Sequence, residues 1–164
     1  MSPELIRIIA EATIDTLHMV AVAGGLGTLL GLPLGVFLAT SKRGELFAAP
    51  AVNAVLGLLV NVTRSTPFII LVVAIVPFTR LVAGTSIGTT AAIVPLTVAA
   101  TPFIARIVEG AIREVDQGLV EAARAMGATP LQIVRKVLVP EALPAVTLGL
   151  TLAAVSLLGF SAMV

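Results

Sequence analysis

Long stretches without a charged residue dominate this sequence. Residues 17–41 and 81–105 each run for 25 residues without Asp, Glu, Lys or Arg, and residues 142–164 are uncharged to the last position. A helix rises 1.5 Å per residue, so about 20 residues cross the roughly 30 Å hydrocarbon core of a bilayer. Lipid leaves backbone polar groups no outside partner, which favours helices for such segments. We therefore predict an all-α integral membrane protein.

Composition agrees with this class and excludes several kinds of chemistry. Hydrophobic residues make up 58% of the chain and charged residues 12%, against about 45–50% and 25% in soluble domains. There is no Cys, and a lone His18 cannot form a histidine metal cluster. The phosphate-binding pattern G-x-x-x-x-G-K-[ST] is absent as well. We predict no catalytic residue, no metal and no cofactor in this chain.

The uncharged runs predict a single transmembrane domain over residues 1–164 with four spans. Their approximate ranges are 15–41, 60–79, 85–105 and 142–164, and a charged loop occupies 106–141. The second span is the least regular, because Arg64 interrupts residues 46–79. We predict one helix from about Val60 to Phe78, preceded by a membrane-hugging helix, with Arg64 near an interface. The apolar ending "LLGFSAMV" leads us to expect a truncated chain and a further span beyond Val164.

The distribution of basic residues predicts the orientation. The positive-inside rule places the side richer in Lys and Arg in the cytoplasm. Two basic residues, Arg7 and Arg80, fall on one side of the predicted spans, and eight fall on the other: Lys42, Arg43, Arg64, Arg106, Arg113, Arg124, Arg135 and Lys136. We therefore expect an extracytoplasmic N-terminus and a cytoplasmic loop 106–141.

Small residues recur every four positions along the first span. They are Ala23, Gly27, Gly31, Gly35 and Ala39. This spacing puts them on one helix face, where a neighbouring backbone can approach closely in lipid. We predict that the face packs against another helix of this subunit or of a second copy.

The charged loop contains the signals of two short helices. Asp116 is a plausible N-cap for a helix over residues 117–126, and Gly127 follows where a left-handed residue would end it. A capping box is predicted after the turn, from Thr129 to Gln132. In the first helix the spacing predicts one apolar face and an ion pair on the opposite side; the residues are Leu119, Ala122, Ala123 and Met126 for the face, and Glu121 and Arg124 for the pair. The second helix is expected to run to about Val139 and to stop before Pro140.

This helix–turn–helix is unsuited to nucleic acid, because membrane spans tether both of its ends and its charge balance is modest. Two other classes stay open at this point: an ion-coupled secondary transporter and a structural membrane subunit. The first would need intramembrane carboxylates, which residues 81–105 and 142–164 lack. The second would not need so ordered a loop.

The segment "EAARAMGATPLQIVRKVLVP" resembles the EAA motif of ABC-importer permeases. It has Glu121-Ala122-Ala123, then Gly127 after three residues, and "VLVP" in place of the usual I-x-L-P. The segments "RSTPFIILVVAIVPFTR" and "GTSIGTTAAIVPLTVAATPFIARIVEGAI", together with "GFSAMV", resemble the methionine-uptake permeases within that family. The resemblance covers essentially the whole chain and implies the type I importer permease fold, with four of five spans present.

The resemblance also implies a set of partners and site residues. It implies a permease homodimer in the bacterial inner membrane, flanked by ATP-binding subunits that hydrolyse ATP and fed by an extracytoplasmic substrate-binding lipoprotein. The coupling residues would be Glu121, Ala122, Ala123, Gly127 and Pro140, with Pro140 setting the exit angle into the fourth span. Met163 is a candidate apolar gate near the outer end of that span. Intramembrane hydroxyls are expected to bond mostly within or between helices; they are Ser65, Thr66, Thr97, Thr101 and Ser161.

Overall fold

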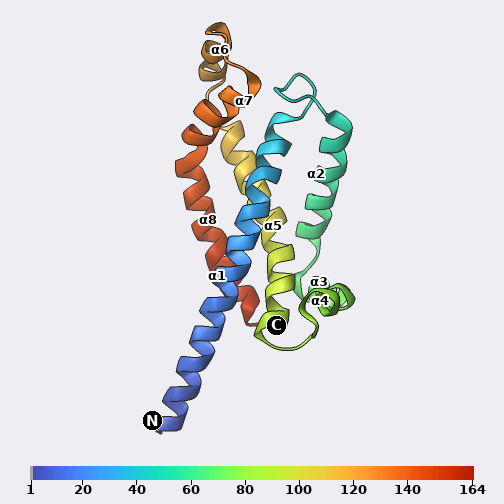
Figure 1. Ribbon diagram of the computed structural model, residues 1–164, viewed down its shortest axis with the longest axis vertical. Helices are drawn as coiled ribbons and strands as arrows, with labels where there is room; N and C mark the ends of the chain where they lie inside the picture. The colour runs from blue at the N-terminus through green and yellow to red at the C-terminus, as the bar shows by residue number, and fades with distance from the viewer. Residues whose placement is uncertain (1) are drawn as a thin grey trace.

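A computed structural model describes residues 2–164 as a bundle of helices (Figure 1). Its long helices are α1 (Pro3–Thr40), α2 (Pro50–Ser65), α5 (Thr89–Arg113) and α8 (Val139–Ser161). The short elements are α3 (Phe68–Ala74), α4 (Val76–Ala83), α6 (Gln117–Ala125), α7 (Pro130–Ile133) and the π-helix η1 (Val134–Leu138). By length and apolarity three helices could cross a membrane, or four if one bent pair counts as a span. The predicted all-helical membrane architecture is confirmed.

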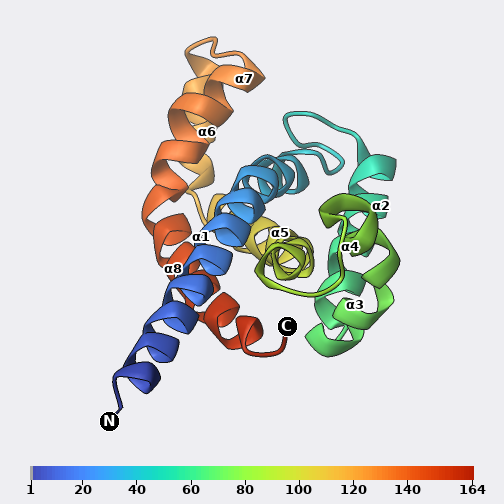
Figure 2. The ribbon, with the colours of Figure 1, turned by 60° about the horizontal axis from the view of Figure 1, so that its bottom comes forward.

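Helix α5 lies at the centre of the bundle, with α1, α2 and α8 around it (Figure 2). Its inward residues are among the most completely buried in the chain, including Leu96, Ile104 and Val108. Much of the outer surface of α1, α2 and α8 is instead covered by exposed leucines and valines. An apolar exterior around a buried core is what a protein solvated by lipid needs.

The small-residue face of α1 packs against α5, so the first of the two predicted partners is confirmed. Ala23, Gly27, Gly31, Gly35 and Ala39 are all buried. A methyl group placed on Gly27 would come 2.6 Å from the Ala100 side chain, and one placed on Gly35 would come 2.5 Å from the Ala105 carbonyl oxygen. These distances are shorter than van der Waals contact. Glycine is therefore required for the two backbones to approach this closely.

The predicted helix from Val60 to Phe78 is wrong. Helix α2 begins at Pro50 and ends at Ser65, and it meets α3 at an angle of 110°. The break falls at Thr66 and Pro67, where proline removes a backbone donor and disfavours helical geometry in the residue before it. Residues 50–59, predicted to lie along the membrane surface, form most of the upright helix, while α3 and α4 are the short, turned elements (Figure 1).

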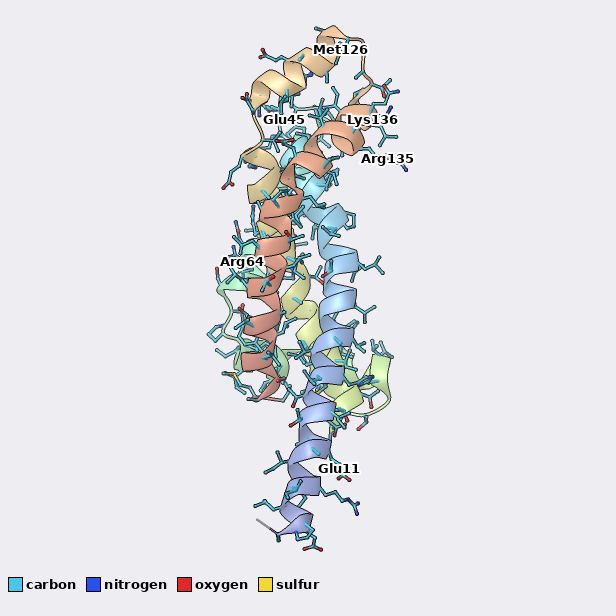
Figure 3. The ribbon with its side chains drawn as sticks, turned by 90° about the vertical axis from the view of Figure 1, so that its left-hand side faces the viewer. Glu11, Glu45, Arg64, Met126, Arg135 and Lys136 are labelled. Atoms are coloured by element: carbon cyan, nitrogen blue, oxygen red, sulfur yellow. The ribbon has the colours of Figure 1, made fainter. Side chains whose placement is uncertain are left out.

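The predicted place of Arg64 is also wrong. It lies in the last turn of α2, fourteen residues after Pro50 and therefore about 21 Å along the axis from the end that carries the Lys42–Glu45 loop. Figure 3 shows it well down the bundle, far from Glu45 and Lys136. Arg64 is therefore removed from the group of basic residues at the loop end.

The charged stretch 106–141 is less of a loop than the sequence predicts. Helix α5 continues through Arg113, so residues 106–113 at the start of that stretch belong to the bundle. At its other end, α7, η1 and α8 form one unbroken helical run from Pro130 to Ser161. The predicted stop before Pro140 is therefore wrong.

Candidate functional site

A helix–turn–helix, formed by α6 and α7, projects at the end of the bundle opposite the N-terminus (Figure 1). Its first helix starts as predicted: the Asp116 side chain accepts a hydrogen bond from the Gly118 N–H at 2.7 Å. This carboxylate satisfies one of the amide donors left free in the first turn of α6. The start of α6 is therefore fixed by a local side-chain contact.

The turn between the two helices has the geometry that its sequence predicts. Gly127 has a φ of 79°, in the left-handed region, where a residue with a Cβ is disfavoured. Its N–H donates to the Arg124 carbonyl at 2.9 Å, and the Ala128 N–H donates to the Ala123 carbonyl at 3.0 Å. These bonds satisfy carbonyls at the end of α6. A Cβ on Gly127 would meet nothing within 4 Å, so the turn presents an open surface.

The second helix begins with a complete capping box, as predicted. The Thr129 hydroxyl accepts from the Gln132 N–H at 3.4 Å, and the Gln132 side chain accepts from the Thr129 N–H at 2.9 Å. Pro130 occupies the first helical position, where its missing N–H costs nothing. Hydrogen bonds therefore fix the turn where it leaves α6 and where it enters α7.

The faces of α6 differ from the prediction. Only Ala123 of the predicted apolar face is buried; Val120 accompanies it, whereas Leu119 and Met126 are 44% and 82% exposed. The side of α6 that faces the bundle carries Val120 and Ala123, so the predicted apolar face is only partly buried. Met126 points away from the bundle in Figure 3. Glu121 and Ala122 are exposed too, and Glu121 is not among the ion-paired residues of the described chain, so the predicted pair with Arg124 is not formed.

The π-helix η1 explains how the chain passes Pro140 without stopping. In a regular α-helix the proline ring would clash with the carbonyl four residues earlier, that of Lys136. In η1 the Val139 N–H instead donates to the Val134 carbonyl, five residues back. The wider turn redirects these carbonyls and lets α8 proceed. Pro140 is exposed in the first turn of α8.

An ion cluster beneath the turn was missed by the sequence analysis. Glu109 of α5 is buried, and it pairs with Arg106 and with Arg113, the second at 2.9 Å. The spacings of three and four residues place all three side chains on one side of the helix. That spacing was the available signal, but residues 106–141 were predicted as one charged cytoplasmic loop, in which no buried ion cluster is expected.

The cluster joins α5 to both neighbouring helices. The Arg106 guanidinium donates to the Gly57 carbonyl at 3.1 Å and to the Asn61 side chain at 2.8 Å, both on α2. The Arg113 guanidinium donates to the Leu38 carbonyl of α1 at 3.3 Å. Because Glu109 neutralises the arginines while they bind these groups, the base of the helix–turn–helix is fixed to three long helices.

The remaining predicted residues lie away from this turn. Met163 follows α8, is about half exposed, and lies near the C-terminus at the end of the bundle away from α6. Four of the five intramembrane hydroxyls donate to carbonyls of their own helices, as expected; these are Thr66, Thr97, Thr101 and Ser161. These hydroxyls keep their acceptor lone pairs free.

Comparisons with known proteins agree with this architecture. The family model described as "Binding-protein-dependent transport system inner membrane component" matches residues 31–164. The probable D-methionine transport system permease protein MetI of Vibrio cholerae serotype O1 is 56% identical over 156 residues, which cover 95% of this chain and 69% of that protein. MetI of Escherichia coli strain K12 is 50% identical, over 99% of this chain and 75% of the relative.

Solved structures give the same result. A chain from the inward-facing MetNI methionine ABC transporter superposes with a TM-score of 0.96 at 50% identity, covering 99% of this chain and 76% of that one. A chain of an amino acid ABC transporter with histidines shares the fold, with a TM-score of 0.72 at 23% identity. The resemblance predicted from the EAA segment is confirmed: this chain belongs to the family of binding-protein-dependent transport system inner membrane components, the permease subunits of ABC transporters.

Proposed function

We propose that this chain is the membrane-spanning subunit of an ATP-driven importer of methionine, as the D- or L-isomer or both. The sequence identity of 50–56% to methionine permeases over nearly the whole chain is the observation that carries the substrate. The functional unit would be a homodimer of this chain with two ATP-binding subunits and an extracytoplasmic binding lipoprotein. Transport would follow from rocking of the spans between outward-open and inward-open arrangements.

The orientation follows from charge. Seven of the ten basic residues lie at or near the bundle end that carries α6, once Arg64 is set aside; these are Lys42, Arg43, Arg106, Arg113, Arg124, Arg135 and Lys136. By the positive-inside rule this end faces the cytoplasm and the N-terminus is extracytoplasmic. The helix–turn–helix would then be available to a cytoplasmic ATPase.

The surface of α6 and its turn suits such a partner. Leu119 and Met126 provide exposed apolar contacts, while Glu121 and Ala122 lie between them along the same short helix. Gly127 keeps the turn free of a side chain. Exposed apolar groups on a rigid element are typical of an interface. Ala123 and Pro140 would act through the shape of the element, the first by packing α6 on its base and the second through the start of α8.

A paired substitution tests the coupling role of Gly127. Gly127→Arg puts a long side chain and a left-handed strain on the turn, whereas Gly84→Arg puts the same change on an open, left-handed glycine, with a φ of 73°, beyond the C-terminus of α4. We expect normal membrane levels for both variants. The first should lose substrate-stimulated ATPase activity in the assembled transporter, and the second should keep it. Equal stimulation in both variants would rule out docking at this turn.

Uptake by the assembled transporter tests the substrate. The permease and its ATPase are reconstituted into vesicles with the ATPase facing the lumen. The binding protein and radiolabelled D- or L-methionine are added outside, and the lumen contains ATP or, as a control, no ATP. We expect ATP-dependent accumulation of at least one isomer. Accumulation of neither, together with intact ATPase activity, would contradict methionine as the substrate.

A further inference from the structure

We infer that the cavity beside Arg64 binds the α-carboxylate of the transported amino acid during its passage through the membrane. The inference rests on the proposed function for the identity of the substrate. Arg64 was predicted near a membrane interface, but it lies deeper in the bundle, beside Phe103. The proposed binding site contains no residue of the helix–turn–helix.

Arg64 lies near the middle of the membrane-spanning bundle. Its guanidinium carbon is 5.9 Å from the centre of the Phe103 ring on α5. Phe103 is ten residues before the end of a 25-residue helix, and therefore about 15 Å from that end of a helix about 37 Å long. Arg64 is in the last turn of α2 and is exposed on the surface of the bundle, at the depth of Phe103 on α5. An arginine at the centre of a membrane span costs about 2.5–3.5 kcal/mol on the insertion scale. A charge held at that depth is typical of a transport pathway.

Two arginines lie at the contact between α2 and α5. Arg106 is neutralised by a carboxylate, whereas Arg64 has no such partner within residues 2–164. Arg106, one turn from Phe103 along α5, pairs with Glu109 and bonds Gly57 and Asn61 on the face of α2 that continues to Arg64. Throughout residues 2–164, Arg64 has no salt bridge and no hydrogen bond from its side chain. Its planar group of five donors is available to a carboxylate, which it can bind through two parallel hydrogen bonds.

The lining of the cavity suits the rest of an apolar amino acid. The cavity holds about 200 Å³ between α2, α3, α5 and α8, and it is lined by Thr63, Arg64, Thr66, Phe68, Phe103 and Phe160 among others. Phe68 and Phe160 stack with their ring centres 4.7 Å apart. These rings provide contacts for an aliphatic or thioether side chain, and sulfur packs favourably against aromatic rings.

The two threonines complete the match. The hydroxyls of Thr63 and Thr66 donate to the carbonyls of Leu59 and Val62 at 2.9 Å each. Each hydroxyl oxygen keeps free lone pairs, which can accept from an α-ammonium group. The cavity thus offers donors for a carboxylate, acceptors for an ammonium and an apolar wall, which together define a small zwitterionic amino acid as ligand.

The experiment compares Arg64→Met, Arg64→Lys and a control, Arg80→Met, in the assembled transporter in vesicles. Arg80 is an exposed arginine on α4 outside the cavity. Two quantities are measured: methionine uptake per ATP hydrolysed, and cross-linking by a diazirine analogue of methionine, mapped by peptide mass spectrometry. The analogue is competed with excess methionine to define specific labelling.

We expect Arg64→Met to keep its membrane level and its assembly with the ATPase while uptake per ATP falls about tenfold or more. Labelling of the peptides that carry Phe68, Phe103 and Phe160 should disappear. Arg64→Lys should retain part of both signals, because lysine keeps the charge but lacks the two-pronged geometry. Arg80→Met should match the unmodified protein.

Two results would overturn the inference. One is unchanged uptake per ATP and unchanged labelling in Arg64→Met. The other is loss of assembly with the ATPase in both Arg64→Met and Arg64→Lys, which would make Arg64 a structural residue. Failure of the proposed function looks different: the unmodified transporter would not import methionine, while a diazirine analogue of another amino acid, such as leucine, would still label the cavity in an Arg64-dependent way.

Discussion

Replacement of Gly35 by alanine measures how strongly the α1–α5 contact depends on glycine. The new methyl group would lie 2.5 Å from the Ala105 carbonyl oxygen and 2.6 Å from the Val108 Cβ. Ordinary contact needs about 3.5–4.0 Å, so the two helices must separate by about 1 Å. Overpacking of this kind costs about 1–3 kcal/mol in a well-packed core.

Alanine also favours the helical state over glycine by about 1 kcal/mol, which would partly hide the cost. Gly25→Ala corrects for this, because Gly25 is on the same helix, is exposed and has nothing within 4 Å of a Cβ. We expect the detergent-solubilised Gly35→Ala protein to melt about 2–12 °C below Gly25→Ala, from the usual 2–4 °C per kcal/mol for a chain of this size. Size-exclusion chromatography after heating follows the loss of folded protein. Equal melting temperatures for the two variants would refute the close-approach argument.

Two further predictions follow from the site. Glu109→Gln leaves Arg106 and Arg113 without their counter-charge, and Arg106 already has a buried Nε without a partner. We expect the free energy of unfolding to fall by about 2–4 kcal/mol, less than for a fully buried pair because water reaches Arg113. The variant should melt at a lower temperature than Glu114→Gln, a control at the same end of α5. Met126→Ser removes an exposed apolar group from α6 and should leave stability within about 0.5 kcal/mol while weakening co-purification with the ATPase. Ile87→Ser, at a residue 84% exposed in the turn before α5, is its control, and equal recovery of the ATPase with both variants would contradict an interface at Met126.

Features that depend on local chemistry could be predicted from the sequence. The cap at Asp116, the left-handed Gly127 and the capping box at Thr129 each involve residues within four positions of one another. The α1 stripe was also predictable, because a four-residue repeat fixes a face whatever its partner is. These elements position most of the candidate coupling site.

Features that depend on distant contacts were not predictable in the same way. The depth of Arg64 follows from how α2 and α5 pack, which local hydropathy does not encode. The 110° break after Ser65 did have a local signal in Pro67, but the apolar run around it favoured a single span. Glu109 was predicted within the charged cytoplasmic loop, because its burial depends on α1 and α2 supplying partners for the arginines beside it, and the sequence does not show those contacts. Pro140 ordinarily predicts a helix end, and only the wider turn of η1 reverses that expectation.

The unbroken run from Pro130 to Ser161 would act as a lever if it moved as one rigid rod. Its 32 residues measure about 48 Å along the axis. A sideways displacement of about 3 Å at the Thr129 end, with the far end as pivot, tilts such a rod by only about 4°. A point halfway along it then moves by about 1.5 Å. Under the proposed coupling role, a push at the Thr129 end would therefore reach the middle of the bundle as a smaller movement.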